Sequence, residues 1–210
     1  MTNPYKTLMK RGADEFIVSK SRFIGFGAPV STEAEAIAFI GEIRAKHREA
    51  SHNVYAYILG VNMGVMRYSD DGEPSGTAGM PVLEVLRAKG LTDCVLVVTR
   101  YFGGTLLGAG GLVRAYAQSA SMAVDACGVG NMYPTARYAM DVDYPLLGRV
   151  EYHLKSQPVE IEEKTFSETV TLTLLVKCRD EQAFVDGVVA ATDGRVQPLR
   201  FEEMYRAWEI

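Results

Sequence analysis

Cysteine is scarce in this chain of 210 residues: there are three, Cys94, Cys127 and Cys178, and no two of them are in CxxC spacing. All three lie in apolar stretches, which favours reduced thiols in a protein core over a disulfide framework or a zinc site. The first residues lack the apolar segment of a secretion signal, and no apolar run is long enough to span a bilayer. We therefore expect a cytoplasmic protein with no membrane partner.

The chain also lacks the strong excess of basic residues that is typical of dedicated nucleic-acid-binding proteins. Its formal net charge is -4. Residues 1–132 carry 13 Lys and Arg against 12 Asp and Glu, whereas residues 133–210 carry 9 against 14. Any contact with a polyanion is therefore expected to come from a local basic patch in the first part of the chain.

A short run of Gly, Asn and Pro residues at 128–134 indicates a domain boundary. It divides the chain into two predicted domains, residues 1–130 and residues 133–210. In the second domain, strand, helix, strand, strand, helix and strand are predicted in turn at residues 135–142, 145–154, 158–164, 168–177, 181–191 and 195–203. This βαββαβ order is that of ferredoxin-like domains.

The first predicted domain also mixes strands and helices, so the expected fold class is α+β. Its strands are expected at residues 16–18, 22–26, 53–59, 65–68 and 94–99. Thr32 and Glu35 form a capping box that predicts the start of a helix. The face of this helix that we expect to be buried carries Ala36, Ile37, Ile40, Ile43 and His47.

The most informative segment is a glycine-rich loop between the apolar residues 94–99 and a predicted helix. Its glycines are Gly103, Gly104, Gly108, Gly110 and Gly111. Glycines allow tight bends and close approach of a partner, and the helix that follows directs free N–H groups at the loop. With Arg100 and Arg114 nearby to supply charge, the loop suits an anion. No Gly-Lys-Ser/Thr sequence is present and the spacing is not that of a dinucleotide-binding loop, so binding is indicated but no reaction.

A second candidate site is the acidic loop at residues 69–79, where Asp70, Asp71 and Glu73 could hold a hard cation such as Mg²⁺. The alternative is a solvated turn with local hydrogen bonds, in which Arg100 or Arg67 pairs with one of the carboxylates. His52 opens a strand near this loop. It could act as a general base or metal ligand, or be a hydrogen-bonded histidine at a strand edge.

A third candidate is the basic and aromatic segment Lys20-Ser21-Arg22-Phe23. Together with Arg100 and Arg114 it could form a cationic surface for RNA or a phosphorylated partner. The alternative is that these basic side chains only face solvent.

Several separated segments, taken together in this order, resemble the IMPACT/YigZ family. They are residues 20–24 (KSRFI), His52-Asn53, 69–79 (SDDGEPSGTAG), 99–104 (TRYFGG) and 108–116 (GAGGLVRAY). The resemblance implies an N-terminal domain with the ribosomal protein S5 domain 2-like fold and a ferredoxin-like C-terminal domain. It also implies a role in the regulation of translation.

The chain departs from the family pattern at two positions. Leu106 stands in the glycine loop where the family usually has a lysine, which removes one charge from the expected anion site. Val54 stands where the family usually has a cysteine, so no thiol nucleophile is available there.

The leading interpretation is a translation regulator that binds RNA, the ribosome or a translation-factor surface, with no cofactor and no catalytic step. The residues expected to bind are Lys20, Arg22, Arg100, Gly103, Gly104, Gly108, Gly110, Gly111 and Arg114. The competing interpretation is a metal-dependent hydrolase in which Asp70, Asp71 and Glu73 hold Mg²⁺ or Mn²⁺ and His52 is the base.

Overall fold

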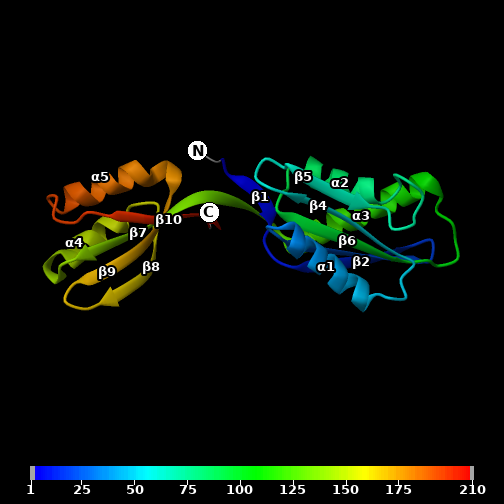
Figure 1. The fold of residues 1–210 in the computed structure, drawn as a ribbon, viewed down its shortest axis with the longest axis horizontal. Helices are drawn as coiled ribbons and strands as arrows, with labels where there is room; N and C mark the ends of the chain where they lie inside the picture. Colours follow the sequence, from blue (N-terminus) through cyan, green and yellow to red (C-terminus); the bar gives the residue numbers. More distant parts are fainter. Residues whose placement is uncertain (1–2, 209–210) are drawn as a thin grey trace. The chain divides into compact units, whose positions relative to one another are not determined.

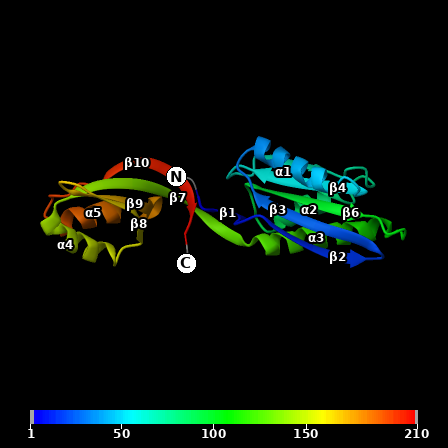
Figure 2. The ribbon, with the colours of Figure 1, turned by 90° about the horizontal axis from the view of Figure 1, so that it is seen from below.

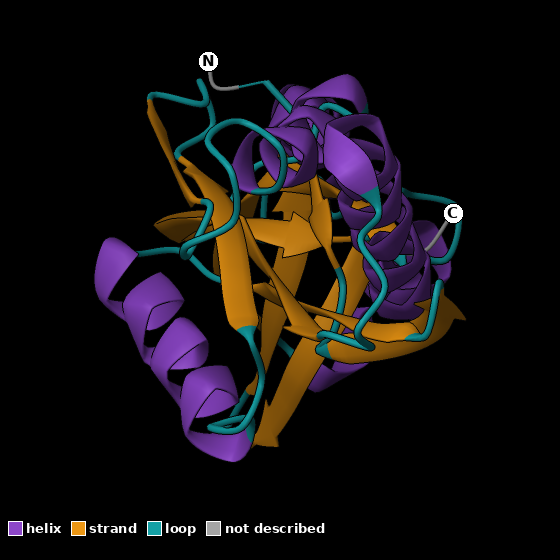
Figure 3. Ribbon diagram, turned by 90° about the vertical axis from the view of Figure 1, so that its right-hand side faces the viewer, coloured by secondary structure: helices purple, strands orange, loops and turns teal. Residues whose placement is uncertain are grey.

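The structure, a computed structural model, describes residues 3–208. The chain divides into two units, each with helices and strands of its own (Figure 1). Figure 3 distinguishes the helices from the strands by colour. The N-terminal unit is Tyr5–Asn131, and the C-terminal unit combines Met132–Ile210 with Met1–Pro4. The fold is α+β in two parts. Among the described residues, no helix has the length and apolar character needed to cross a membrane.

The N-terminal unit is built on a five-stranded antiparallel sheet with the strand order β2-β3-β6-β4-β5. Its elements are β1 (Tyr5–Leu8), β2 (Gly12–Val18), β3 (Ser21–Pro29), α1 (Glu33–Lys46), β4 (His52–Leu59), β5 (Val65–Ser69), α2 (Gly79–Ala88), β6 (Cys94–Tyr101) and α3 (Gly108–Cys127). Helix α1 lies on one face of the sheet and α3 on the other (Figure 2). Helix α2 shares the core of α3.

Strand β6 is the central strand of this sheet, and its sequence explains its position. Residues 94–98 are apolar and completely buried, as expected for a strand with helices over both faces. The predicted strand at 94–99 is confirmed. Because β6 runs through the middle of the unit, the loop after it emerges between the two neighbouring strands, β3 and β4.

Helix α1 begins as its capping residues predict. The Thr32 hydroxyl accepts a hydrogen bond from the N–H of Glu35 at 3.2 Å, and the Glu35 carboxylate accepts one from the N–H of Ser31 at 2.7 Å. The buried face carries Ala36, Phe39, Ile40 and Ile43. The prediction for Ile37 was wrong: this side chain is 59% exposed, because the stripe at i, i+3, i+4 and i+7 from Ala36 is the one that meets the sheet.

The C-terminal unit has an antiparallel sheet in which β10, β7, β9 and β8 lie in that order. Its elements are β7 (Val129–Val142), α4 (Tyr144–Leu154), β8 (Val159–Phe166), β9 (Val170–Lys177), a short 3-10 helix (Cys178–Asp180), α5 (Glu181–Ala191) and β10 (Leu199–Ala207). Both α4 and α5 contribute to one core on a single face of the sheet, including Val150 and Phe184 (Figure 2).

Two boundaries in this unit differ from the predicted ones. The segment predicted as a turn-like boundary is the start of β7, which begins at Val129 and is 14 residues long. Strand β10 begins at Leu199 instead of residue 195. The reason is that α5 ends in a tight cap: Gly194 has a φ of 77°, and its N–H donates to the Val189 carbonyl at 2.8 Å. Residues 195–198 connect this cap to β10 and therefore are not part of the strand.

Candidate functional site

The glycine loop lies between β6 and α3, and its glycines have identifiable structural reasons. A Cβ atom on Gly103 would lie 1.9 Å from the carbonyl oxygen of Lys20, so only glycine fits against the β2–β3 turn. Gly104 and Gly108 have φ angles of 80° and 68°, which strain other residues. The loop therefore combines a close backbone contact with two left-handed turns.

Helix α3 begins without a cap. Its N-cap residue, Leu107, makes no capping hydrogen bond through its side chain, and the first turn contains no acidic residue. Gly108, Ala109 and Gly110 are exposed, and Gly111 is half-buried. The first N–H groups of a helix have no partner within it and carry a partial positive charge. This end of α3 is thus open to an anion.

Arg100 does not face solvent as a free cation. Its Nη1 donates to Oε1 of Glu73 at 2.6 Å, and the two side chains are only 6% and 4% exposed. The prediction that Arg100 or Arg67 pairs with one of the carboxylates is met by Arg100. The expectation that Arg100 offers its charge to a ligand in solvent is not met, because Glu73 neutralises it inside the protein.

Arg100 is further held by aromatic rings and a hydroxyl. Its guanidinium carbon lies 5.4 Å from the ring centre of Phe23 and 5.3 Å from that of Phe102. Its Nη2 donates to Ser21 Oγ at 3.3 Å, and this hydroxyl also accepts the N–H of Gly103 at 3.2 Å. The arginine therefore ties the glycine loop to β3.

Glu73 is the centre of a buried polar network. Besides Arg100, the hydroxyl of Tyr116 donates to its Oε1 at 2.7 Å. Burial and this carboxylate raise the pKa of Tyr116 well above its ordinary value. Sequence reasoning did not select Tyr116 as a site residue. The available signal was a tyrosine on the apolar face of a helix, where a buried hydroxyl needs a partner.

The other two acidic residues of the loop have structural partners. The Asp70 carboxylate accepts the N–H groups of Gly76, Ala78 and Gly79 at 2.9, 3.2 and 2.7 Å, which caps the start of α2. The Asp71 carboxylate accepts the backbone N–H of Asn53 at 2.6 Å and pairs with Arg44 at 2.6 Å.

These contacts leave the predicted metal site without support. Asp70, Asp71 and Glu73 direct their carboxylates at three different sets of protein donors. Within residues 3–208, no group of three His, Cys, Asp or Glu side chains is arranged to hold a metal ion. The three carboxylates are close in sequence but do not form one site, because each of them binds different partners in the protein.

His52 lies beside the glycine loop and Glu73. Its Nδ1 is 2.8 Å from the carbonyl oxygen of Asp71, and since a carbonyl only accepts, Nδ1 is the donor. Its Nε2 is 3.7 Å from Oε1 of Glu73. The structure thus brings His52 together with Glu73 but not with the carboxylates of Asp70 and Asp71.

A cavity of about 430 Å³ opens where these parts meet. His52, Glu73 and Arg100 supply its polar side, and Phe102, Leu106 and Leu112 supply apolar walls. Gly108 and Ala109, at the start of α3, also line it. The glycine loop therefore borders an open cavity, and the side chains of the loop do not fill this cavity.

The remaining predicted binding residues have different surroundings. Lys20, in the β2–β3 turn, and Arg114, on α3, are exposed, and neither forms an ion pair within the described part of the chain. Arg22 is exposed too, but it pairs with Glu15 at 2.5 Å and lies over the ring of Tyr101. Lys20 and Arg114 are the two that keep an uncompensated positive charge.

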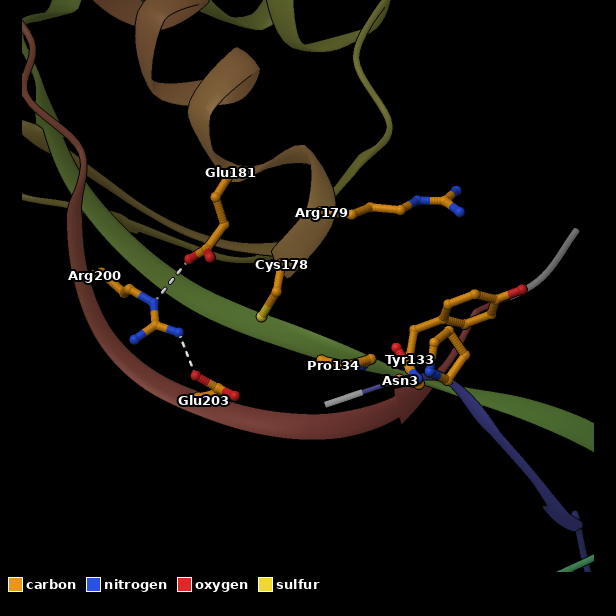
Figure 4. A pocket seen from close by; sticks show the side chains of 9 residues that line it. Asn3, Tyr133, Pro134, Cys178, Arg179, Glu181, Arg200 and Glu203 are labelled. Atoms are coloured by element: carbon orange, nitrogen blue, oxygen red, sulfur yellow. Dashed lines mark hydrogen bonds and ion pairs between the residues drawn. The ribbon is translucent and has the colours of Figure 1, made fainter. Parts of the chain in front are cut away.

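The C-terminal unit contains a second cavity, of about 480 Å³, which sequence reasoning did not predict (Figure 4). Arg200 lies in its wall and pairs with Glu181 at 2.7 Å and Glu203 at 2.5 Å. Cys178 also lines it, and burial raises the pKa of this thiol. The paired charges and the protonated thiol give this cavity little chemistry of its own.

Comparisons with known proteins agree with the division into two units. Residues 19–124 match the family described as the Impact N-terminal domain, and residues 140–195 match a domain of unknown function, DUF1949. The chain is 41% identical to the IMPACT family member YvyE of Bacillus subtilis, over 93% of this chain and 90% of that protein. It is 32% identical to the IMPACT family member YigZ of Escherichia coli, over 89% and 92%.

More distant matches cover less of the chain or show the fold. The Protein IMPACT homolog of Dictyostelium discoideum is 37% identical over 42% of this chain and 26% of its own length. A solved structure titled "Crystal structure of an hypothetical protein" matches with a TM-score of 0.63 and 29% identity, and covers 96% of this chain and 99% of that one.

Proposed function

Because this chain belongs to the IMPACT family, we propose that it regulates translation and does so by binding RNA with the N-terminal unit. The sequence left RNA, the ribosome and a translation-factor surface open as partners. RNA is favoured because the features that remain free on the site are those that bind phosphate.

One observation carries this proposal: the exposed glycine loop leads into a helix whose first N–H groups have no side-chain cap. Such an end binds phosphate groups through its N–H donors and its partial charge. In α1 and α2, by contrast, Thr32 and Asp70 accept N–H groups at the helix start. The first N–H groups of α3 have no such side-chain acceptor and can donate to a phosphate group of a ligand.

The charges around the loop point the same way. Lys20 lies in the β2–β3 turn, and its own carbonyl packs against Gly103; Arg114 lies one turn beyond the exposed glycines of α3. Neither has an acidic partner among residues 3–208, so both can pair with phosphates. Two cations form a small patch, and we therefore expect modest, salt-sensitive affinity.

We further infer a ribosomal protein S5 domain 2-like fold for the N-terminal unit and a ferredoxin-like fold for the C-terminal one. Family membership supports the first inference. The strand order β10-β7-β9-β8, with both helices on one face, supports the second. The metal-dependent hydrolase is not carried forward, because its carboxylates already have structural partners.

The proposal is tested by the fluorescence anisotropy of a labelled single-stranded RNA at rising salt concentrations. We expect the affinity to fall with salt. The slope of log affinity against log salt is negative, and each lost phosphate contact should reduce its magnitude by about 0.7. The double variant Lys20→Ala, Arg114→Ala should therefore reduce the magnitude of the slope by about 1.4.

The matched control is the double variant Arg87→Ala, Lys89→Ala, which removes one arginine and one lysine from the end of α2. It should bind like the unmodified protein. RNA binding that is absent, or that both double variants weaken equally, would refute the proposed function.

A further inference from the structure

We propose that the cavity beside the glycine loop accepts the base of one unpaired nucleotide, whose phosphate lies at the start of α3. This inference rests on the proposed binding of RNA and names the part of the RNA that the site takes. A base that enters a pocket must be unstacked, which is how proteins recognise single-stranded RNA.

The cavity has the composition of a pocket for a flat, partly polar ring. Its volume of about 430 Å³ has room for a nucleoside, and its walls are largely the apolar side chains of Phe102, Leu106 and Leu112. Polar groups are concentrated at His52, Glu73 and Arg100. Apolar walls with a few convergent polar groups are the usual form of a small-ligand site.

Phe102 provides a surface on which a base can stack. Phe102 is 47% exposed although it contacts a buried arginine. The guanidinium of Arg100 lies over the ring, 5.3 Å from its centre. This contact holds the ring in place and leaves the remainder of it to a ligand, and stacking of bases on aromatic rings is a general mode of single-strand binding.

The polar side of the cavity contains a hydrogen-bond acceptor, so it suits a ligand group that donates hydrogen bonds. Within the described residues, Oε2 of Glu73 accepts no hydrogen bond, while Oε1 takes those of Arg100 and Tyr116. The Nδ1 of His52 donates to the Asp71 carbonyl, and its Nε2 lies 3.7 Å from Oε1 of the same carboxylate. The second carboxylate oxygen can accept from an amino group, which adenine, cytosine and guanine carry and uracil lacks.

The phosphate of the same nucleotide would meet α3. Gly108 and Ala109 line the cavity and belong to the uncapped first turn. A base in the cavity therefore brings its own phosphate within reach of free N–H donors. Arg100, whose Nε is buried without an acceptor, lines the same cavity.

In the test, nucleoside 5′-monophosphates are titrated into the 210-residue protein, and the amide signals are followed by two-dimensional NMR. We expect AMP, CMP and GMP to shift the amide signals of residues 102–109 and to bind more tightly than UMP. In the variant Ala109→Phe, a ring fills the cavity from an exposed position, and the affinity should fall at least about tenfold. The matched control is Ala38→Phe on the exposed face of α1, which should bind normally.

A comparison of two RNAs separates this inference from the proposed function. An oligonucleotide with abasic sites keeps its phosphates but has no base to insert, so it should bind about tenfold more weakly than the intact one. If both RNAs bind equally well, the base-binding cavity is refuted while RNA binding stands. Monophosphates that bind as described without any RNA binding would support the cavity and refute the proposed role in RNA binding. Monophosphates that leave residues 102–109 unchanged would overturn the inference.

Discussion

Arg100 and Arg114 lie on either side of the glycine loop, and the fold gives them opposite surroundings. Arg100 is buried against Glu73, which is 27 residues earlier in the chain. Arg114 is exposed and has no ion pair in the described part of the chain. Sequence reasoning could select both as basic residues near a loop. It could not tell them apart, because burial depends on which distant segment folds against each side chain.

The buried pair makes Arg100 a structural residue. Arg100→Ala leaves Glu73 as a buried charge without its main partner, which should lower the free energy of unfolding by about 3–5 kcal/mol. Arg22→Ala removes an exposed, solvent-screened pair with Glu15 and should cost far less stability than Arg100→Ala. Urea denaturation of both variants measures this difference. Equal, small losses would contradict the description of Arg100.

The pKa of His47 depends in part on the nearby positive charge of Arg22. It lies between the rings of Phe26 and Tyr101, and burial, together with the positive charge of Arg22, lowers its pKa below the ordinary value of 6.5. Since the folded protein then binds fewer protons here than the unfolded chain, this residue reduces stability as the pH falls below 6.5.

The variant Arg22→Ala should raise the pKa of His47, because it removes one of three causes that lower this pKa, the others being burial and the positive charge of Lys46. An NMR titration of the imidazole signals measures it, with Arg87→Ala as the control that should leave this pKa unchanged. A His47 pKa that stays the same in Arg22→Ala would contradict the contribution of the Arg22 charge.

At the level of elements, the order of strands and helices was largely predictable from the sequence. The strand at residues 94–99 is a continuous apolar run, and the helix after Thr32 begins with a recognisable cap. The start of β7 was not predictable, because Gly, Asn and Pro usually mark turns, whereas here the extended backbone forms ladder pairs with β10 from Met132 onward. Pairing with a strand 60 to 75 residues later in the chain outweighs local preference.

The glycines of the loop are predicted to differ sharply in their tolerance of alanine. Gly103→Ala should cost about 2 kcal/mol or more, because the new Cβ meets the Lys20 carbonyl oxygen at 1.9 Å. Gly110→Ala should be neutral or stabilise the protein by up to about 1 kcal/mol, because its nearest neighbour is 3.9 Å away and alanine favours a helix. Thermal unfolding of both variants measures the difference. A Gly103→Ala variant as stable as Gly110→Ala would contradict the close contact with the β2–β3 turn.

At the scale of the whole molecule, the two units divide the charge unequally. The first part of the chain is almost neutral, and the second is acidic. The charge asymmetry could be predicted from composition. The network around Glu73 and the cavity beside it could not, because they unite β4, β6, α3 and the acidic loop, whose residues are far apart in the sequence. The asymmetry supports the proposal that RNA binds to the N-terminal unit.

The most direct test of this account is hydrogen–deuterium exchange of the full-length protein with and without single-stranded RNA. We predict slower exchange on RNA binding for the amides of residues 102–111, including the first turn of α3, and no change in α2. RNA that binds while residues 102–111 exchange as before, or that protects only residues of the C-terminal unit, would contradict it.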